Sequence, residues 1–211
     1  DRWNGLILAD VSNPAAPTIM GDVENHAALA CEIAHPGDDP ALLQCLGDSG
    51  SIEEIAIGGG HAFLAARDTL MIVNVGDPLN PYLLTTFDDF VSGGDLDGGA
   101  FGIDLVEHPE PDAPYERVAY IAALDKGLVI VDVSKAHEPA VLSVASNLFP
   151  GSAPFDARGV EVVGNTAVVS DPTGGWYIYD VSDPTAPVLR DQYTLNLNDP
   201  FTPHDTTIAL P

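Results

Sequence analysis

Five polar residues, each placed where a strand is expected to begin, carry the candidate binding chemistry of the chain. They are Glu53, Glu54, Arg158, His204 and Asp205. A histidine beside a carboxylate can act as a general base or as a pair of metal ligands. Adjacent strand residues point to opposite faces, so only one of His204 and Asp205 can face a shared cavity. Two interpretations stay open: an acid–base or metal site, or the polar lining of a water-filled channel. No residue is assigned a catalytic role.

A second candidate is the acidic segment at 87–99, which holds four Asp and four Gly. Calcium takes several oxygen ligands from a chain that bends sharply, so Asp95 and Asp97 are candidate calcium ligands. The segment lacks the full EF-hand pattern, because Gly99 and Val106 stand where further ligands are expected. A solvated acidic turn without bound metal is the alternative interpretation.

The two cysteines, Cys31 and Cys45, flank a loop-like segment with two prolines and one glycine. An even cysteine count without a CxxC or zinc spacing is typical of a disulfide that closes a loop. Such a bond favours an extracellular or periplasmic location. Two free, buried thiols are the alternative.

The net charge of the chain disfavours some classes of binding partner. Its 211 residues include 32 acidic and 7 basic ones, for a net charge of −25. No basic patch is available to neutralise phosphates, so a nucleic-acid partner is not expected. Docking on anionic lipid is disfavoured for the same reason. No apolar run approaches the roughly 18–20 residues of a membrane span, so membrane insertion is not expected either. The acidity suits solubility in a saline medium, or reflects cation binding.

Four copies of one sequence motif, which we call the repeated phrase, define the strands and turns that must position these residues. The copies are GLILADVSNPAAP from Gly5, TLMIVNVGDPLNP from Thr69, GLVIVDVSKAHEP from Gly127 and GWYIYDVSDPTAP from Gly175. Each reads as an apolar strand, a turn that Asp or Asn opens and Pro closes, and the start of another strand. A repeat of this length built from short strands is typical of a β-propeller.

Two further strand-like runs precede each complete phrase, which predicts four-stranded antiparallel blades at about 51–87, 100–146 and 157–194. Residues 1–23 hold two strands of another blade, and 204–210 read as the first strand of the next. We therefore expect an all-β propeller over 1–211, either a portion of a longer propeller or a compact four-bladed domain. The starts of the first strands lie around the channel mouth of such a fold, where the five polar residues are expected.

The repeat resembles the LVIVD-repeat family, whose name is the string at residues 128–132. The string DVSDPTAP at 180–187 is similar to the turn signature of that family, and PHDTTIAL at 203–210 is similar to the start of its next repeat. The resemblance implies a secreted or surface-attached β-propeller. It carries no agreed catalytic residues, so none is transferred to this chain.

From these observations we expect a non-catalytic binding or structural module of an extracellular or cell-surface assembly. Its partner would be a protein or a polysaccharide, and open blade edges would favour contact with other chains. The alternative is an enzyme with a metal or acid–base site at the channel mouth, where His204 and Glu54 would converge. Fold alone does not decide between these functions.

Overall fold

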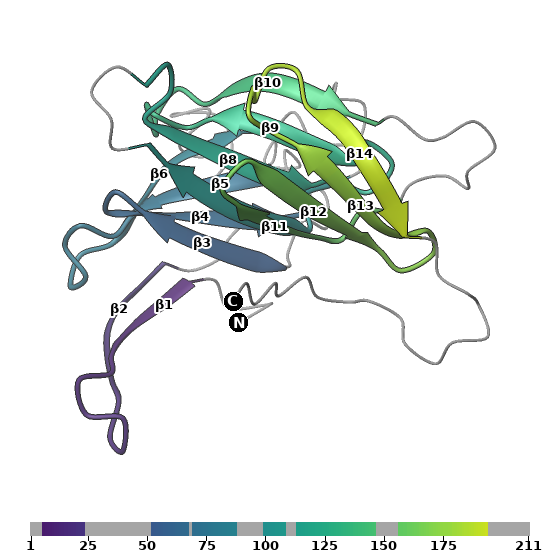
Figure 1. Ribbon diagram of the computed structural model, residues 1–211. Helices are drawn as coiled ribbons and strands as arrows, with labels where there is room; N and C mark the ends of the chain where they lie inside the picture. Colours follow the sequence, from purple (N-terminus) through teal and green to yellow (C-terminus); the bar gives the residue numbers. More distant parts are fainter. Residues whose placement is uncertain are drawn as a thin grey trace, which may run out of the picture.

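The described part of the chain folds into four antiparallel sheets (Figure 1). The computed structural model describes residues 6–23, 52–67, 69–87, 99–108, 113–146 and 156–193. These ranges contain fourteen strands. None of them contains a helix with the length and apolarity that a membrane crossing requires. The all-β class predicted from the sequence is confirmed.

Three of the sheets have four strands each, and we name them blades I, II and III. Their strands, in spatial order, are β3 (Glu54–Gly58), β4 (His61–Ala66), β5 (Thr69–Asn74) and β6 (Tyr82–Phe87) in blade I; β7 (Gly102–Glu107), β8 (Arg117–Ala122), β9 (Leu128–Asp132) and β10 (Ala140–Ala145) in blade II; and β11 (Gly159–Val163), β12 (Thr166–Asp171), β13 (Gly175–Asp180) and β14 (Val188–Tyr193) in blade III. The fourth sheet, which we name the partial blade, pairs β1 (Leu6–Asp10) with β2 (Thr18–Val23).

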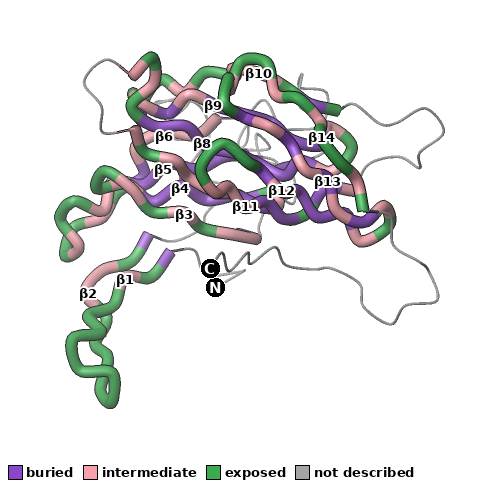
Figure 2. The backbone as a smooth tube through the Cα atoms, viewed as in Figure 1, coloured by how far each residue is buried: buried purple, intermediate pink, exposed green. Residues whose placement is uncertain are grey.

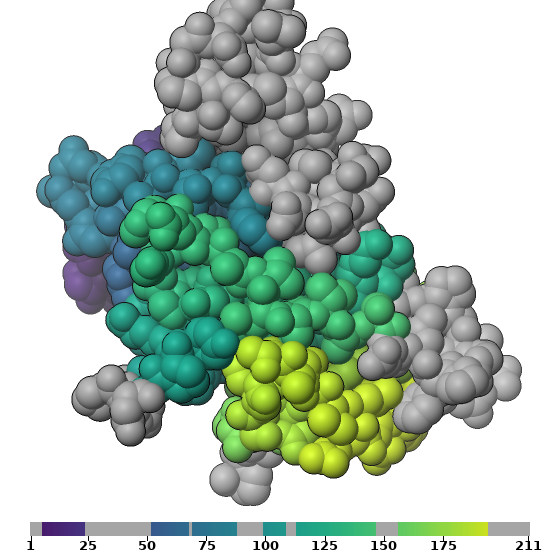
Figure 3. Space-filling model, turned by 90° about the horizontal axis from the view of Figure 1, so that it is seen from above, coloured from purple at the N-terminus to yellow at the C-terminus, as the bar shows by residue number. Residues whose placement is uncertain are grey.

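The blades are arranged as in a β-propeller, as predicted. Strand β7 contacts both β3 and β11, so the first strands of successive blades line a common centre. In Figure 3 blades I, II and III follow one another in chain order, from blue through teal and green to yellow. The strand predicted at 204–210 lies outside the described residues.

Each blade packs through two faces. We call the face toward the following blade its front face and the face toward the preceding blade its back face. Between blades I and II the main apolar residues are Phe63, Leu70 and Ile72 on the front face of blade I and Ile121, Val129 and Val131 on the back face of blade II. Between blades II and III the counterparts are Tyr120, Leu128 and Ile130 on the front face of blade II, and Val169, Tyr177 and Tyr179 on the back face of blade III. Among the described residues, the middle strands are therefore the most buried (Figure 2).

Backbone bridges also join neighbouring blades, at the turn between the second and third strands. Arg67 pairs with Ala100 between blades I and II, and Leu124 pairs with Ala157 between blades II and III. Arg67 and Leu124 have positive φ angles of 52° and 39°. This conformation costs a residue with a side chain about 1 kcal/mol or more. The bridging hydrogen bonds offset that cost, and they fix the turn of one blade against the entrance of the next.

The turn between the third and fourth strands is closed by the side chains that the repeated phrase provides. Oδ1 of the first Asp or Asn accepts a hydrogen bond from the backbone N two residues later, at 2.8 to 3.1 Å, in Asp10, Asn74, Asp132 and Asp180. The backbone N–H of Ser12 lowers the pKa of Asp10, and the guanidinium of Arg190 lowers the pKa of Asp180. Both carboxyls are thereby held in the ionised form that accepts these hydrogen bonds.

Candidate functional site

One repeat position brings candidate residues from all three blades to the same face of the propeller. Glu53, Phe101 and Arg158 each stand directly before or at the start of a first strand. Their backbone N atoms donate to the second strand of the same blade, to Ala65 O, Ala122 O and Ser170 O, at 2.8, 2.9 and 2.9 Å. We call this side the mouth face. The turn that carries Arg67 lies on it too, because Arg67 bridges to Ala100.

The ring of Phe101 is the centre of a cluster on the mouth face. The guanidinium carbons of Arg158 and Arg67 lie over this ring, 4.8 Å and 5.5 Å from its centroid. A cation over an aromatic ring is attracted by about 0.5–1 kcal/mol at an exposed site. Arg67 belongs to blade I, Phe101 to blade II and Arg158 to blade III, so the contact joins three blades.

Two carboxylates orient these arginines. Nε of Arg67 donates to Oε1 of Glu53 over 2.9 Å, and Nε of Arg158 donates to Oδ1 of Asp156 over 3.0 Å. The arginine side chains are 49% and 40% exposed. Among the described residues, the side-chain hydrogen bonds of both arginines are made through Nε. The Nη groups are therefore available to a ligand. We name the five residues Glu53, Arg67, Phe101, Asp156 and Arg158 the mouth cluster.

Glu54 has a different task from its neighbour Glu53. Its Oε2 accepts a hydrogen bond from the backbone N of Ile103, in the first strand of blade II, over 2.8 Å. Asp104 repeats this contact one blade later, because its Oδ2 accepts from the backbone N of Val162 over 2.7 Å. These two carboxylates connect the first strands of successive blades.

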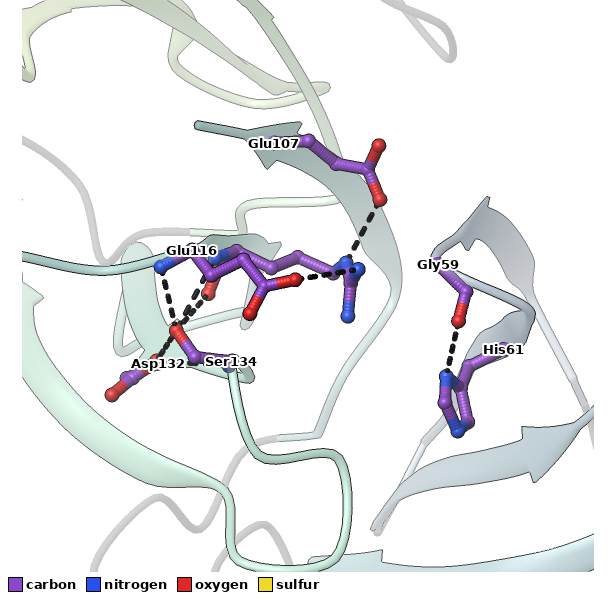
Figure 4. A network of polar contacts seen from close by, with 7 residues as sticks. Gly59, His61, Glu107, Glu116, Asp132 and Ser134 are labelled. Carbon is purple, nitrogen blue, oxygen red and sulfur yellow. Dashed lines mark hydrogen bonds and ion pairs between the residues drawn. The ribbon is translucent and has the colours of Figure 1, made fainter. Parts of the chain in front are cut away.

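The opposite face carries a second arginine network (Figure 4). Nε of Arg117 donates to Oε1 of Glu107 over 3.0 Å, and Glu116 lies 4.0 Å from its Nη2. The side chain of Arg117 is only 8% exposed. Its guanidinium packs against the first turn of blade I so closely that a Cβ on Gly59 would overlap with it. Arg117 is therefore enclosed between two blades, unlike the half-exposed arginines of the mouth cluster.

Of the residues predicted from the sequence, Glu53 and Arg158 enter the mouth cluster and Glu54 lies beside it. His204, Asp205, Asp95, Asp97, Cys31 and Cys45 lie outside the described residues. Sequence reasoning missed Arg67, Phe101 and Asp156. The register of the repeat could have found Phe101, since it occupies the position of Glu53 and Arg158. In the part of the chain that the structure describes, no three His, Cys, Asp or Glu side chains are grouped to hold a metal ion.

Comparison with known families decides the assignment of the fold. The LVIVD repeat matches residues 1–25, 49–89, 115–144 and 155–195. The chain belongs to the LVIVD repeat family. The four matched regions contain the partial blade and most strands of blades I, II and III, so the predicted family is confirmed. Comparison with curated proteins gives no match.

Proposed function

We propose that this LVIVD-repeat propeller is a non-catalytic binding and structural module of an extracellular or cell-surface assembly. In this proposal the mouth face binds a carboxylate group of a protein or polysaccharide partner. The observation that supports it best is the mouth cluster, in which two half-exposed arginines are held by carboxylates and by one aromatic ring.

The geometry of the two arginines suits a planar anion. A guanidinium offers donors in a fixed fork that matches a carboxylate in a bidentate way. Arg67 and Arg158 already have their Nε atoms engaged, so their orientation is largely set before a ligand arrives. Binding then loses less side-chain entropy than it would with free arginines. A carboxylate on the Nη groups of either arginine would complete its hydrogen bonding.

Electrostatics favours the same location. The mouth cluster pairs two guanidiniums with two carboxylates, in a chain of net charge −25. An anionic partner meets less repulsion at such a neutral cluster than elsewhere on an acidic surface. The engaged carboxylates fit binding better than proton transfer, since Glu53 and Asp156 are held in ion pairs.

The location outside the cell is supported by composition. The excess of acidic residues suits a saline medium, and Cys31 and Cys45 suit an oxidising one. A calcium site at Asp95 and Asp97 stays a prediction, which calcium titration of the purified protein would test.

The experiment is a binding titration with three probes: an oligogalacturonate, a glutamate-rich peptide and a neutral oligosaccharide. We expect saturable binding of at least one carboxylate probe and none of the neutral one. Arg67→Lys and Arg158→Lys keep the charge but lose the fork, and each should weaken binding roughly ten-fold or more. Arg190→Lys is the matched control, because Arg190 also pairs with an aspartate, Asp180, away from the mouth face.

The carboxylate probe that binds more tightly identifies the source of the group. Absence of saturable binding to both carboxylate probes would overturn the assignment of the mouth face. Equal loss in Arg190→Lys and in the two mouth variants would do the same. Chemical conversion of a bound probe would instead support the enzymatic alternative.

A further inference from the structure

The two ends of the described array expose the two halves of an interface that the molecule also forms internally. Val168, Trp176 and Ile178 on the front face of blade III occupy the positions of Phe63, Leu70 and Ile72 in blade I. The blade I residues are fully buried by blade II. Their blade III counterparts are only partly buried, so this front face is not covered to the same extent.

The partial blade shows the converse at its back face. Ile7 and Val11 occupy the positions of Tyr177 and Val181, which are buried against blade II. In the partial blade these residues are 46% and 65% exposed. Figure 1 shows β1 and β2 at the opposite end of the array from β13 and β14. Within the described ranges, the front face of blade III and the back face of the partial blade are therefore both less covered than their counterparts inside the array.

We propose that a second copy of this chain docks head to tail, with the back face of its partial blade on the front face of blade III. The contact would continue the interface that joins blades I, II and III within one chain. Because it uses different patches on the two copies, it is heterologous and can propagate into a ring or filament. This proposal goes beyond ligand binding at the mouth face and does not rest on it.

A hollow on the front face of blade III marks where an incoming side chain would fit. A cavity of about 320 Å³ is lined by Thr166, Ile178, Asp180 and Arg190, among others. It lies by the first turn of blade III, where a Cβ on Gly164 would meet no atom within 4 Å. At the corresponding turn of blade I, the guanidinium of Arg117 from the next blade packs against Gly59. The turn of blade III therefore has room for a side chain from a following blade, as the turn of blade I does. No described residue occupies that space.

One residue of the front face departs from the internal pattern. At the interface of blades II and III, Oγ of Ser143 donates to the carbonyl of Pro184 over 2.7 Å. The position of Ser143 opposite Ile130 is taken in blade III by Asp191, opposite Ile178. An ionised Asp191 cannot donate to the carbonyl of the equivalent Pro14 in a second copy. This mismatch weakens the proposed contact and offers a way to strengthen it.

Sedimentation of the full chain over a range of concentrations tests the proposal. Tyr193 pairs with Trp176 and stacks on its ring, so it belongs to the front face of blade III. We expect species heavier than the 22.1 kDa monomer, and a shift to monomer in either Val11→Glu or Tyr193→Glu, with at least a ten-fold weaker association. Leu79→Glu, at an exposed turn tip of blade I outside both faces, is the control and should associate as the unaltered chain does. Thermal unfolding of each variant verifies that it is folded.

Two further sedimentation experiments distinguish a head-to-tail contact from other modes of association. Mixing Val11→Glu with Tyr193→Glu leaves one intact half on each chain, so the mixture should form a dimer that grows no further. Asp191→Ser should tighten association several-fold. A chain that sediments as a monomer at every concentration overturns the proposal. Association that neither face variant weakens, or a mixture that stays monomeric, overturns it as well.

Discussion

The interface between blades I and II differs in chemistry from the interface between blades II and III, although both use the same repeat positions. The first is built from aliphatic residues and Phe63, and Arg117 closes it at one edge. The second contains Tyr120, Tyr177 and Tyr179, whose phenolic groups are polar. The comparison shows that the repeat fixes which positions meet, while the chemistry of each interface is set residue by residue.

Burial of the tyrosines makes the second interface sensitive to alkaline pH. Burial, with a smaller contribution from the charge of Asp104, raises the pKa of Tyr120 from 10.0 to about 12. Burial also raises the pKa of Tyr179, whose hydroxyl lies 3.5 Å from the carbonyl of Ala145. No tyrosine is among the apolar residues that define the first interface.

The largest expected effect is therefore a loss of stability at high pH that originates in the second interface. Below pH 10 both the folded and the unfolded chain hold the Tyr120 proton. As pH rises from 10 toward 12 the unfolded chain gives it up first, so the free energy of unfolding falls. The loss is roughly 2–3 kcal/mol across this window for Tyr120 alone. Urea unfolding of the unaltered chain and of Tyr120→Phe at several alkaline pH values measures it.

The variant Tyr120→Phe should lose less stability across the same pH window than the unaltered chain. Tyr82→Phe, on the exposed outer strand of blade I, serves as the control and should follow the unaltered chain. An equal pH dependence in Tyr120→Phe and Tyr82→Phe would show that the second interface is not the origin of the effect.

Removal of Arg117 should have the next largest effect, at the edge of the first interface. Arg117→Ala removes a buried side chain that packs on Gly59 and leaves Glu107 without its ion pair. We expect a loss of about 2 kcal/mol in the free energy of unfolding. Arg67→Ala, a half-exposed arginine with a similar ion pair, should lose less than about 1 kcal/mol. Similar losses in the two variants would contradict the distinction between the two faces.

The two equivalent glycines of blades I and III isolate the contact with Arg117. Gly59 and Gly164 have φ angles of +54° and +58°, so alanine at either position is strained by about 1 kcal/mol. Only Gly59→Ala also displaces a guanidinium, and we expect it to lose about 1 kcal/mol more than Gly164→Ala. In the Arg117→Ala background that excess should disappear, which a double-mutant cycle of urea unfolding measures.

The smallest expected effect concerns the third turn of the repeated phrase, which borders the first interface through Ala136. Lys135 stands where Asn13, Asp77 and Asp183 accept a hydrogen bond from the backbone two residues later. Lys135→Asn restores this acceptor and should stabilise the chain by about 0.5 kcal/mol. Lys135→Ala loses the same ion pair with Glu138 without gaining an acceptor. Stabilisation by both variants would show that the new hydrogen bond is not responsible.

The sequence predicts the strands and turns of this fold better than the contacts between blades. Runs such as the one at 128–132 and the acceptors Asp10 and Asp180 act within a few residues, so their pattern predicts local structure. The left-handed turns at Arg67 and Leu124 could not be predicted, because neither residue type favours a positive φ. Those turns are stabilised by a bridge to a residue more than thirty positions away.

The candidate site was predictable only in part, for a similar reason. Glu53 and Arg158 stood out because they are charged at the start of a strand. Phe101 did not, because an aromatic residue at a strand start is usually part of a core. Its role depends on two arginines that approach it from other blades, and no local pattern in the sequence records that approach.

The carboxylates of Glu54 and Asp104 have a consequence for how such chains grow over evolutionary time. Each accepts a hydrogen bond from a main-chain N–H of the following blade. That donor is present whatever side chains the blade carries. A gene duplication that inserts one more copy of the repeat would find its attachment point already in place. A change in the number of blades would then require no accompanying substitution in the blade that precedes the inserted one.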